Sequence, residues 1–323
     1  MNILITGCAG FIGFHLVQKI SNKKNINIIG IDIINAYYDV NLKLDRLNII
    51  KKIKNFKFYK IDINNNKKLE YLFKKYKISL VVHLAAQAGV RYSILNPKSY
   101  VDNNIYGFFN ILEAVRKFNV KKIIYASSSS VYGSSDHFPT KEKQNTDEPK
   151  SFYAATKKCN EIFASSYSSL YKIDCIGLRF FTVYGPFGRP DMSLYKFVDS
   201  IYKNKKVEIY NFGNHQRDFT YIDDVINSLE KIIFIRNSSK ASNTVYNVAT
   251  GKPISLRRYL TSIEKIIGRK AKVKLLPFQK GDAIKTHASN IELFKKISYK
   301  PSTDIMVGLN NFIEWYKNYN NIN

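Results

Sequence analysis

A glycine-rich turn between two short apolar segments is the feature that most constrains this 323-residue chain. Asn2–Thr6 has the length and composition of a strand, and Phe11–Ile20 carries an apolar stripe with the period of a helix. The turn that joins them places glycines at Gly7, Gly10 and Gly13. Glycines let the backbone turn tightly and approach a pyrophosphate, whose charge lies at the N-terminus of the following helix. The pattern therefore favours a dinucleotide-binding strand–turn–helix unit.

The same alternation of short apolar runs and longer helical patterns continues through the first half of the chain. Further strands are expected at Ile26–Ile31, Phe56–Ile61, Leu80–Leu84, Lys122–Ala126 and Ile173–Phe180. The clearest helical patterns cover Val101–Phe118 and Ser151–Tyr171. Such alternation predicts an α/β fold of Rossmann type, in which helices cover both faces of a doubly wound parallel sheet.

The second half of the chain has shorter strand patterns and less regular helices. We predict an NAD-binding Rossmann domain over residues 1–178 and a smaller C-terminal α/β substrate lobe over residues 179–323. The boundary is soft, because segments of two such lobes often interleave. The last helical pattern, Asp304–Tyr319, is expected to serve packing alone.

Acidic and small residues follow the predicted strands where a dinucleotide would lie. Asp32 ends the second strand, about 20 residues after the glycine turn. A carboxylate there accepts hydrogen bonds from ribose hydroxyls and repels a 2′-phosphate, so NAD is favoured over NADP. The other cofactor-binding candidates lie in the glycine turn or directly after the third and fourth strands, and they are Phe11, Ile12, Asp62, Ile63, Leu84, Ala85 and Ala86.

A Tyr-x-x-x-Lys pair supplies the candidate catalytic residues. The spacing alone is weak evidence, because the chain contains three such pairs: Tyr71/Lys75, Tyr153/Lys157 and Tyr202/Lys206. The second pair is distinguished by its setting, at the start of a long helical pattern and after the fifth strand and its serine-rich turn. On a helix, residues four apart share one face, so both side chains can point at a nicotinamide and its ribose.

The expected chemistry follows from these residue types. A phenol with a pKa near 10 is a poor base at neutral pH. We expect the Lys157 ammonium and the positive nicotinamide to lower the pKa of Tyr153, so that it can take a proton from a sugar hydroxyl. Ser128, in the row Ser128-Ser129-Ser130, is expected to hydrogen-bond the reacting oxygen.

Charge and cysteine content add weaker constraints. The formal net charge is +26, but Lys is spread along the whole chain, which indicates solvated faces rather than a nucleic-acid site. Such a surface helps to attract an anionic substrate. No apolar run reaches the roughly 18 residues of a membrane span. Three cysteines without ligand spacing indicate reduced thiols and a cytoplasmic protein, and the scattered histidines predict no metal.

Over nearly its whole length the chain resembles the extended short-chain dehydrogenases, in particular their NAD-dependent nucleotide-sugar epimerases. Four segments are similar to UDP-glucuronate 4-epimerases: residues 39–43, 83–93, 179–192 and 217–224. The resemblance implies tightly held NAD, a UDP-sugar substrate and inversion at C4 of UDP-glucuronate to give UDP-galacturonate. It also implies a homodimer formed through the helices at Val101–Phe118 and Ser151–Tyr171.

The resemblance also implies roles for individual residues. Asn103 and Phe181 are expected near the cofactor, and Arg189 and Arg217 are expected to contact the UDP moiety. A 4-keto uronate is a β-keto acid that tends to lose CO₂, so its carboxylate must be restrained. We expect hydroxyl donors to do this, from the serine row (Ser128, Ser129, Ser130) and from Thr182.

Other reactions and other functions stay open. Related dehydratases carry Thr-Asp-Glu, and related decarboxylases carry Thr-Ser-Glu, at the place of the serine row, so Ser130 argues against both reactions. The main alternative is a 4-epimerase of a neutral UDP-hexose or a UDP-N-acetylhexosamine, and a UDP-glucuronate decarboxylase is less favoured. A non-catalytic NAD- or RNA-binding protein is a further alternative. Arg91, Gln279 and Asp282 lie in family-like segments without an assignable role.

Overall fold

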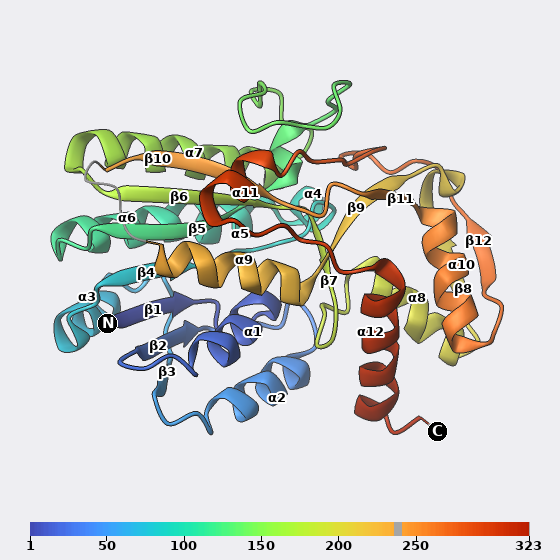
Figure 1. Ribbon diagram of the computed structural model, residues 1–323, viewed down its shortest axis with the longest axis horizontal. Helices are drawn as coiled ribbons and strands as arrows, with labels where there is room; N and C mark the ends of the chain where they lie inside the picture. The colour runs from blue at the N-terminus through green and yellow to red at the C-terminus, as the bar shows by residue number, and fades with distance from the viewer. Residues whose placement is uncertain (236–240, 323) are drawn as a thin grey trace.

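A seven-stranded parallel sheet forms the centre of the larger lobe in the computed structural model, which describes residues 1–235 and 241–322 (Figure 1). The strand order is β10-β6-β5-β4-β1-β2-β3, so the winding direction reverses between β1 and β4. In open α/β sheets, ligands bind at the carboxyl ends of the strands beside such a reversal. The bounds are β1 (Asn2–Thr6), β2 (Asn27–Asp32), β3 (Phe56–Lys60), β4 (Leu80–His83), β5 (Lys122–Ser128), β6 (Asp174–Phe180) and β10 (Asn243–Val248).

Helices cover both faces of this sheet, because the strands are apolar on both sides. One face packs against α3 (Asn66–Tyr76), α6 (Gly107–Lys117) and α7 (Phe152–Tyr171), and the other packs against α1 (Phe11–Ile20), α2 (Val40–Ile50) and α9 (Ile222–Phe234). Side chains such as Leu4 and Ile5, neighbours on β1, bury into opposite cores. The α/β Rossmann prediction is confirmed.

The helix expected over Val101–Phe118 differs from the prediction. Its first part is a π-helix, η1 (Val101–Tyr106), and only the part from Gly107 onward is α-helical. A π-turn has a wider ring than an α-turn and often marks a functional site. Here it carries Asn103, which lines the cavity described below, and Asn104, whose side chain accepts from the amide of Gln87 at 2.8 Å.

The second half of the chain builds a smaller lobe from two small sheets. One has the order β11-β9-β7, and the other pairs β12 with β8. The bounds of its strands and helices are β7 (Thr182–Tyr184), β8 (Lys206–Ile209), β9 (Gln216–Tyr221), β11 (Pro253–Ser255), β12 (Lys272–Leu275), α8 (Ser193–Tyr202), α10 (Leu256–Ile267), α11 (Ile291–Ile297) and α12 (Ile305–Tyr319). The remaining short helices are α4 (Tyr92–Leu95), α5 (Pro97–Tyr100), η2 (Ser129–Tyr132) and η3 (Tyr210–Gly213).

The chain returns to the larger lobe after entering the smaller one. β10 pairs in parallel with β6 in the large sheet, and α9 packs on α1. Segments from the two halves of the sequence therefore interleave, and the division at residue 178 remains an approximate prediction. Within the described ranges, no helix is both long and apolar enough to cross a membrane.

Candidate active site

A large cavity of about 960 Å³ lies at the carboxyl ends of the strands and is lined by residues of both lobes. Every cofactor, catalytic and substrate candidate taken from the sequence lines this cavity. Because these residues come from both lobes and from widely separated segments of the chain, the fold itself brings them together. They are Gly7, Gly10, Phe11, Ile12, Gly13, Asp32, Asp62, Ile63, Leu84, Ala85, Ala86, Asn103, Ser128, Ser129, Ser130, Tyr153, Lys157, Phe181, Thr182, Arg189 and Arg217.

The glycine turn has the geometry that a dinucleotide requires. A Cβ on Gly13 would lie 2.2 Å from the carbonyl oxygen of Gly7, and Gly7 itself has a φ of +70°. Side chains at these positions would therefore break the turn. Helix α1 begins after Gly10 without a side-chain cap among the described residues, so its first amides face the cavity. Free amides at a helix N-terminus suit a diphosphate, and the turn fits NAD.

Asp32 is held at the end of β2 by backbone amides. Its carboxylate accepts from the amide of Ala9 at 3.1 Å and from that of Ile34 at 2.8 Å. Burial raises the pKa of Asp32, while the Ile34 amide and the charge of Lys43 oppose that rise. The Lys43 ammonium binds the backbone and side-chain oxygens of Asn35 at 2.7 and 2.5 Å. This corner of the cavity suits a ribose diol.

Tyr153 and Lys157 lie on the cavity face of α7, as the sequence predicted. The Lys157 ammonium donates to the carbonyl of Ala126 on β5 at 2.9 Å, and burial lowers its pKa from 10.5 to about 8. Burial also raises the pKa of Tyr153, while a hydrogen bond with Ser128 and the charge of Arg189 lower it. Lys157 is not among the groups that shift the pKa of Tyr153 in this structure, and its ammonium binds Ala126 instead. The joint effect of Lys157 and a positive nicotinamide on this pKa stays a prediction.

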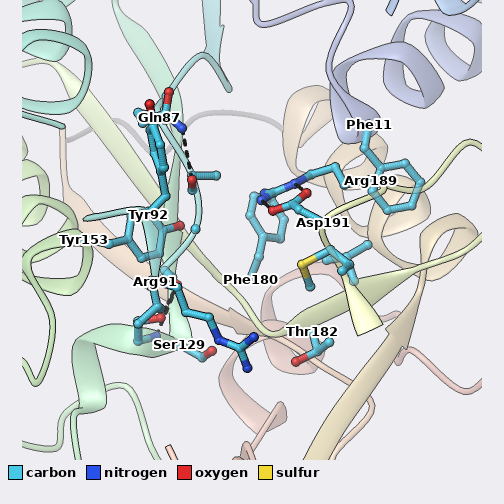
Figure 2. A pocket seen from close by; sticks show the side chains of 18 of the residues that line it. Phe11, Gln87, Arg91, Tyr92, Ser129, Tyr153, Phe180, Thr182, Arg189 and Asp191 are labelled. Atoms are coloured by element: carbon cyan, nitrogen blue, oxygen red, sulfur yellow. Dashed lines mark hydrogen bonds and ion pairs between the residues drawn. The ribbon is translucent and has the colours of Figure 1, made fainter. Parts of the chain in front are cut away.

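The serine row lies at the junction of β5 and η2. Ser128 ends the strand and caps the short helix, accepting from the amide of Ser130 at 3.2 Å and donating to its hydroxyl at 3.1 Å. Figure 2 shows Ser129 near Tyr153 on one side of the pocket and Thr182 on another. Hydroxyls from two lobes therefore face the space beside Tyr153.

A buried ion pair behind the serine row was missed at the sequence level. Arg179 on β6 binds Glu161 on α7 through two hydrogen bonds, at 2.8 and 2.7 Å, and Ser127 donates to the same carboxylate at 2.6 Å. Arg179 also donates to the hydroxyl of Tyr132 at 2.9 Å. Because these contacts join β5, β6, α7 and η2, they fix the strand end that carries Ser128. The partners are far apart in sequence, so local patterns gave no signal.

Two arginine clusters of the smaller lobe face the cavity. Arg189 forms a two-bond pair with Asp191, at 2.9 and 2.5 Å, and Figure 2 shows this pair beside Phe11, across the pocket from Tyr153. Arg217 on β9 donates to Asp282 at 2.8 Å. Asp282 also lies 3.9 Å from Arg91, whose guanidinium stacks over the ring of Tyr210. The role that the sequence could not give Asp282 is thus partly structural, because it links two cations from different lobes.

Several cavity residues carried no sequence signal that singled them out. Phe180 lines the cavity together with Phe181, and Figure 2 shows its ring near the Arg189–Asp191 pair. Tyr37, Tyr92 and Gln87 line it as well. Tyrosine is so abundant in this chain that no single one could be selected from the sequence. Phe180 ends an apolar strand, so it could not be distinguished from an ordinary core residue.

The fold and site together define an NAD-dependent enzyme of the extended short-chain dehydrogenase class. The chain belongs to the NAD dependent epimerase/dehydratase family, whose model matches residues 3–249. Protein CapI of Staphylococcus aureus is 46% identical, with 99% of each chain covered. A UDP-glucuronate 4-epimerase of Thermodesulfobacterium geofontis is 43% identical over 97% of this chain and 95% of its own. The UDP-glucuronic acid 4-epimerase of Bacillus cereus, solved with UDP-glucuronic acid and NAD, superposes with a TM-score of 0.93 at 31% identity, covering 99% of this chain and 100% of that one.

Proposed function

We propose that this protein is an NAD-dependent 4-epimerase that interconverts UDP-glucuronate and UDP-galacturonate. The observation that carries the proposal is the meeting of Tyr153, Lys157 and a hydroxyl-lined wall without an acid in a cavity with a dinucleotide turn. Relatives with this function align over nearly the whole chain. The serine row separates this reaction from dehydration and decarboxylation, which use an acid at the place of Ser130.

The chain's own residues would divide the work as follows. Tyr153 takes the proton from the 4-hydroxyl and, after the sugar has turned its other face, returns a proton to the same oxygen. Ser128 hydrogen-bonds that oxygen, while Lys157 holds the nicotinamide ribose. Bound NAD supplies the acceptor and donor of the hydride at C4. Arg189 and Arg217 hold the diphosphate through charge-assisted bonds, so the nucleotide stays fixed while the sugar turns.

The restraint on the uronate carboxylate belongs to the same proposal. Loss of CO₂ from a β-keto acid is fastest when the bond that breaks stands perpendicular to the ketone plane. Ser129, Ser130 and Thr182 supply neutral donors that hold the carboxylate away from this geometry. No charged acid is needed for such orientation.

Two further features complete the proposal. The enzyme is a homodimer in the cytoplasm. Apolar side chains on neighbouring helices support the dimer, since Tyr106 on η1, Phe109 on α6 and Ile162 on α7 are each at least 40% exposed. The thiols of Cys8, Cys159 and Cys175 are free, as suits a reducing compartment.

The decisive experiment is to incubate the purified protein with UDP-glucuronate, without added NAD, and to identify the products by NMR. We expect UDP-galacturonate alone. A UDP-pentose would instead make the enzyme a decarboxylase. If the protein stays inactive even with added NAD⁺ but converts UDP-glucose or UDP-N-acetylglucosamine, the substrate assignment is wrong and the hydride chemistry stands.

A matched pair of variants tests the assignment of the base. Tyr153→Phe should lower kcat by about 10² to 10⁴, the usual contribution of a general acid–base group. Tyr71→Phe is its control, because it removes the hydroxyl of another Tyr-x-x-x-Lys pair, on the exposed face of α3. Equal activity of the two variants would overturn the role of Tyr153.

A further inference from the structure

Residues 185–192, here called the strap, cross from β7 toward the glycine turn and carry Arg189 and Asp191 into the cavity. The strap begins at Gly185, whose φ of +145° and contact with Ile222 leave no room for a side chain. Phe187 has a φ of +56°, in the left-handed region that bulky residues rarely adopt. Such a conformation persists only where surrounding contacts hold it.

Three side chains of the larger lobe hold the strap. On α1, Nε2 of His15 lies 2.9 Å from the carbonyl oxygen of Pro186. On α2, Nη2 of Arg46 donates to the carbonyl of Phe187 at 2.6 Å. On the loop after β2, the hydroxyl of Tyr37 donates to Oδ2 of Asp191 at 3.1 Å. The strap is therefore attached to three separate elements of the lobe that contains the dinucleotide turn.

Arg46 joins the strap directly to that turn. Its guanidinium is fully buried, and Nη1 donates to the carbonyl of Ala9 at 3.0 Å and to the hydroxyl of Tyr38 at 2.7 Å. Within residues 1–235 and 241–322 it forms no ion pair with a carboxylate. Burying such a group among neutral partners is costly, so its position is well determined by the fold.

The two ends of the strap differ in how firmly they are held. The ring of Phe187 packs against Phe14 at 4.9 Å and against Trp315 at 5.0 Å, which fixes the first half in the core. The second half contacts Tyr37 of the larger lobe at the cavity surface, through the Tyr37–Asp191 hydrogen bond and through the Arg189 guanidinium, which lies 5.9 Å from the centroid of the Tyr37 ring. Burial and the charge of Asp191 raise the pKa of Tyr37, so the phenol keeps its proton and remains the donor.

The strap and the loop of Tyr37 meet at the cavity, which both Tyr37 and Asp191 line. Tyr37 lies on the loop that leaves Asp32, and Asp32 accepts from the amide of Ala9 in the glycine turn. These contacts close a ring. Ala9 donates to Asp32, the loop leads from Asp32 to Tyr37, and Tyr37 donates to Asp191. The strap leads back from Asp191 to Phe187, and Arg46 joins the carbonyl of Phe187 to that of Ala9. The glycine turn, which suits a diphosphate, is therefore itself part of this ring of contacts.

We propose that the strap encloses the diphosphate of bound NAD, and that Tyr37, acting through Asp191, is the positioning residue that holds the strap shut and fixes Arg189. This inference rests on the proposed function, because it takes NAD as the resident cofactor. It assigns the retention of that cofactor to the contacts between Tyr37 and the strap. Opening the second half of the strap then requires that the Tyr37–Asp191 hydrogen bond and the contact of Arg189 with the Tyr37 ring break.

The test compares Tyr37→Phe with wild type and with Tyr71→Phe, a matched loss of one tyrosine hydroxyl on the surface of α3. Each protein is passed repeatedly through a desalting column, and the NAD that remains is released with acid and quantified. We expect Tyr37→Phe to lose NAD about tenfold faster or more, as for a lost hydrogen bond to a charged group. Added NAD⁺ should restore kcat to within about twofold, while KM for UDP-glucuronate rises because Arg189 is less well placed.

A second variant covers the case in which Tyr37→Phe folds poorly. Asp191→Asn keeps the size of the side chain but weakens its bonds to both Tyr37 and Arg189, and it should release NAD at least as fast. Retention equal to wild type in both variants overturns the proposal. Fast release from Asp191→Asn alone overturns the part of Tyr37. Absence of bound NAD in the wild type, even after incubation with it, would instead count against the proposed function.

Discussion

At the scale of single residues, Lys157 shows how a site for chemistry differs from a site for stability. Its ammonium is buried and donates to the carbonyl of Ala126, and burial lowers its pKa from 10.5 to about 8. The folded protein thus binds this proton less tightly than the unfolded chain does. The charged form therefore costs the folded state about 3 kcal/mol below pH 8, and the cost fades as the pH rises from about 8 to 10.5.

We predict that Lys157→Met loses activity by about 100-fold or more without losing stability. At pH 7 its free energy of unfolding in urea should equal or exceed that of the wild type, since a buried charge has been replaced by an apolar chain of similar length. The difference should shrink when the same titration is run near pH 9.5. A variant less stable than wild type at pH 7 would mean that the bond to Ala126 outweighs the burial of the charge.

At the scale of elements, the sequence predicted the strands and the glycine turn that line one part of the cavity. The strands at Asn2–Thr6 and near Leu80–Leu84 were predicted because buried parallel strands are apolar throughout, and Asp32 marks the end of another. A motif residue that directly follows such a strand, as Gly7 follows β1, must then lie at the carboxyl edge of the sheet. These patterns involve residues close together in the sequence, so a single amino-acid sequence is enough to recognise them.

Contacts between distant segments could not be predicted in this way. The π-turn at Val101–Tyr106 has the composition of an α-helix, and its widened ring is seen only in the folded chain. The Arg179–Glu161 pair and the Tyr37–Asp191 bond join segments whose approach depends on tertiary packing. Local propensities and residue spacings do not predict such long-range pairs.

The junction of β5 and η2 carries a prediction about product choice. Ser130→Glu places a carboxyl where related decarboxylases have one, and Thr182→Ala removes a neutral donor on β7. We expect either change to raise the share of UDP-pentose among the products by about tenfold, the effect of one hydrogen bond to a charged group. Product ratios by NMR measure it, with Ser165→Ala on the exposed face of α7 as the control. If neither variant forms pentose, the hydroxyls do not restrain the carboxylate.

At the scale of the whole molecule, the two lobes are joined at several places rather than by one linker. β10 returns from the second half of the chain to pair with β6, and Tyr319 of α12 donates to Asp45 of α2 at 2.5 Å. The C-terminal helix also packs Trp315 on Phe187 of the strap. A packing role was expected for α12, and in the structure its packing supports the segment that carries Arg189.

Exposed apolar side chains on two helices of the larger lobe lead to the last prediction. Phe109 on α6 and Ile162 on α7 are 40% and 55% exposed, and these two helices pack side by side. With a net charge of +26, two chains repel one another, so a dimer must bury enough apolar area to overcome that repulsion. We expect the wild type to have the mass of two chains by light scattering, with association strengthened by salt, which screens the repulsion.

The double variant Phe109→Glu/Ile162→Glu should have the mass of one chain. Val273→Glu, on the 43% exposed side chain of a β12 residue in the other lobe, should leave the dimer intact. A wild type with the mass of one chain at every salt concentration, or dissociation of the β12 variant as well, would show that these helices do not form the interface.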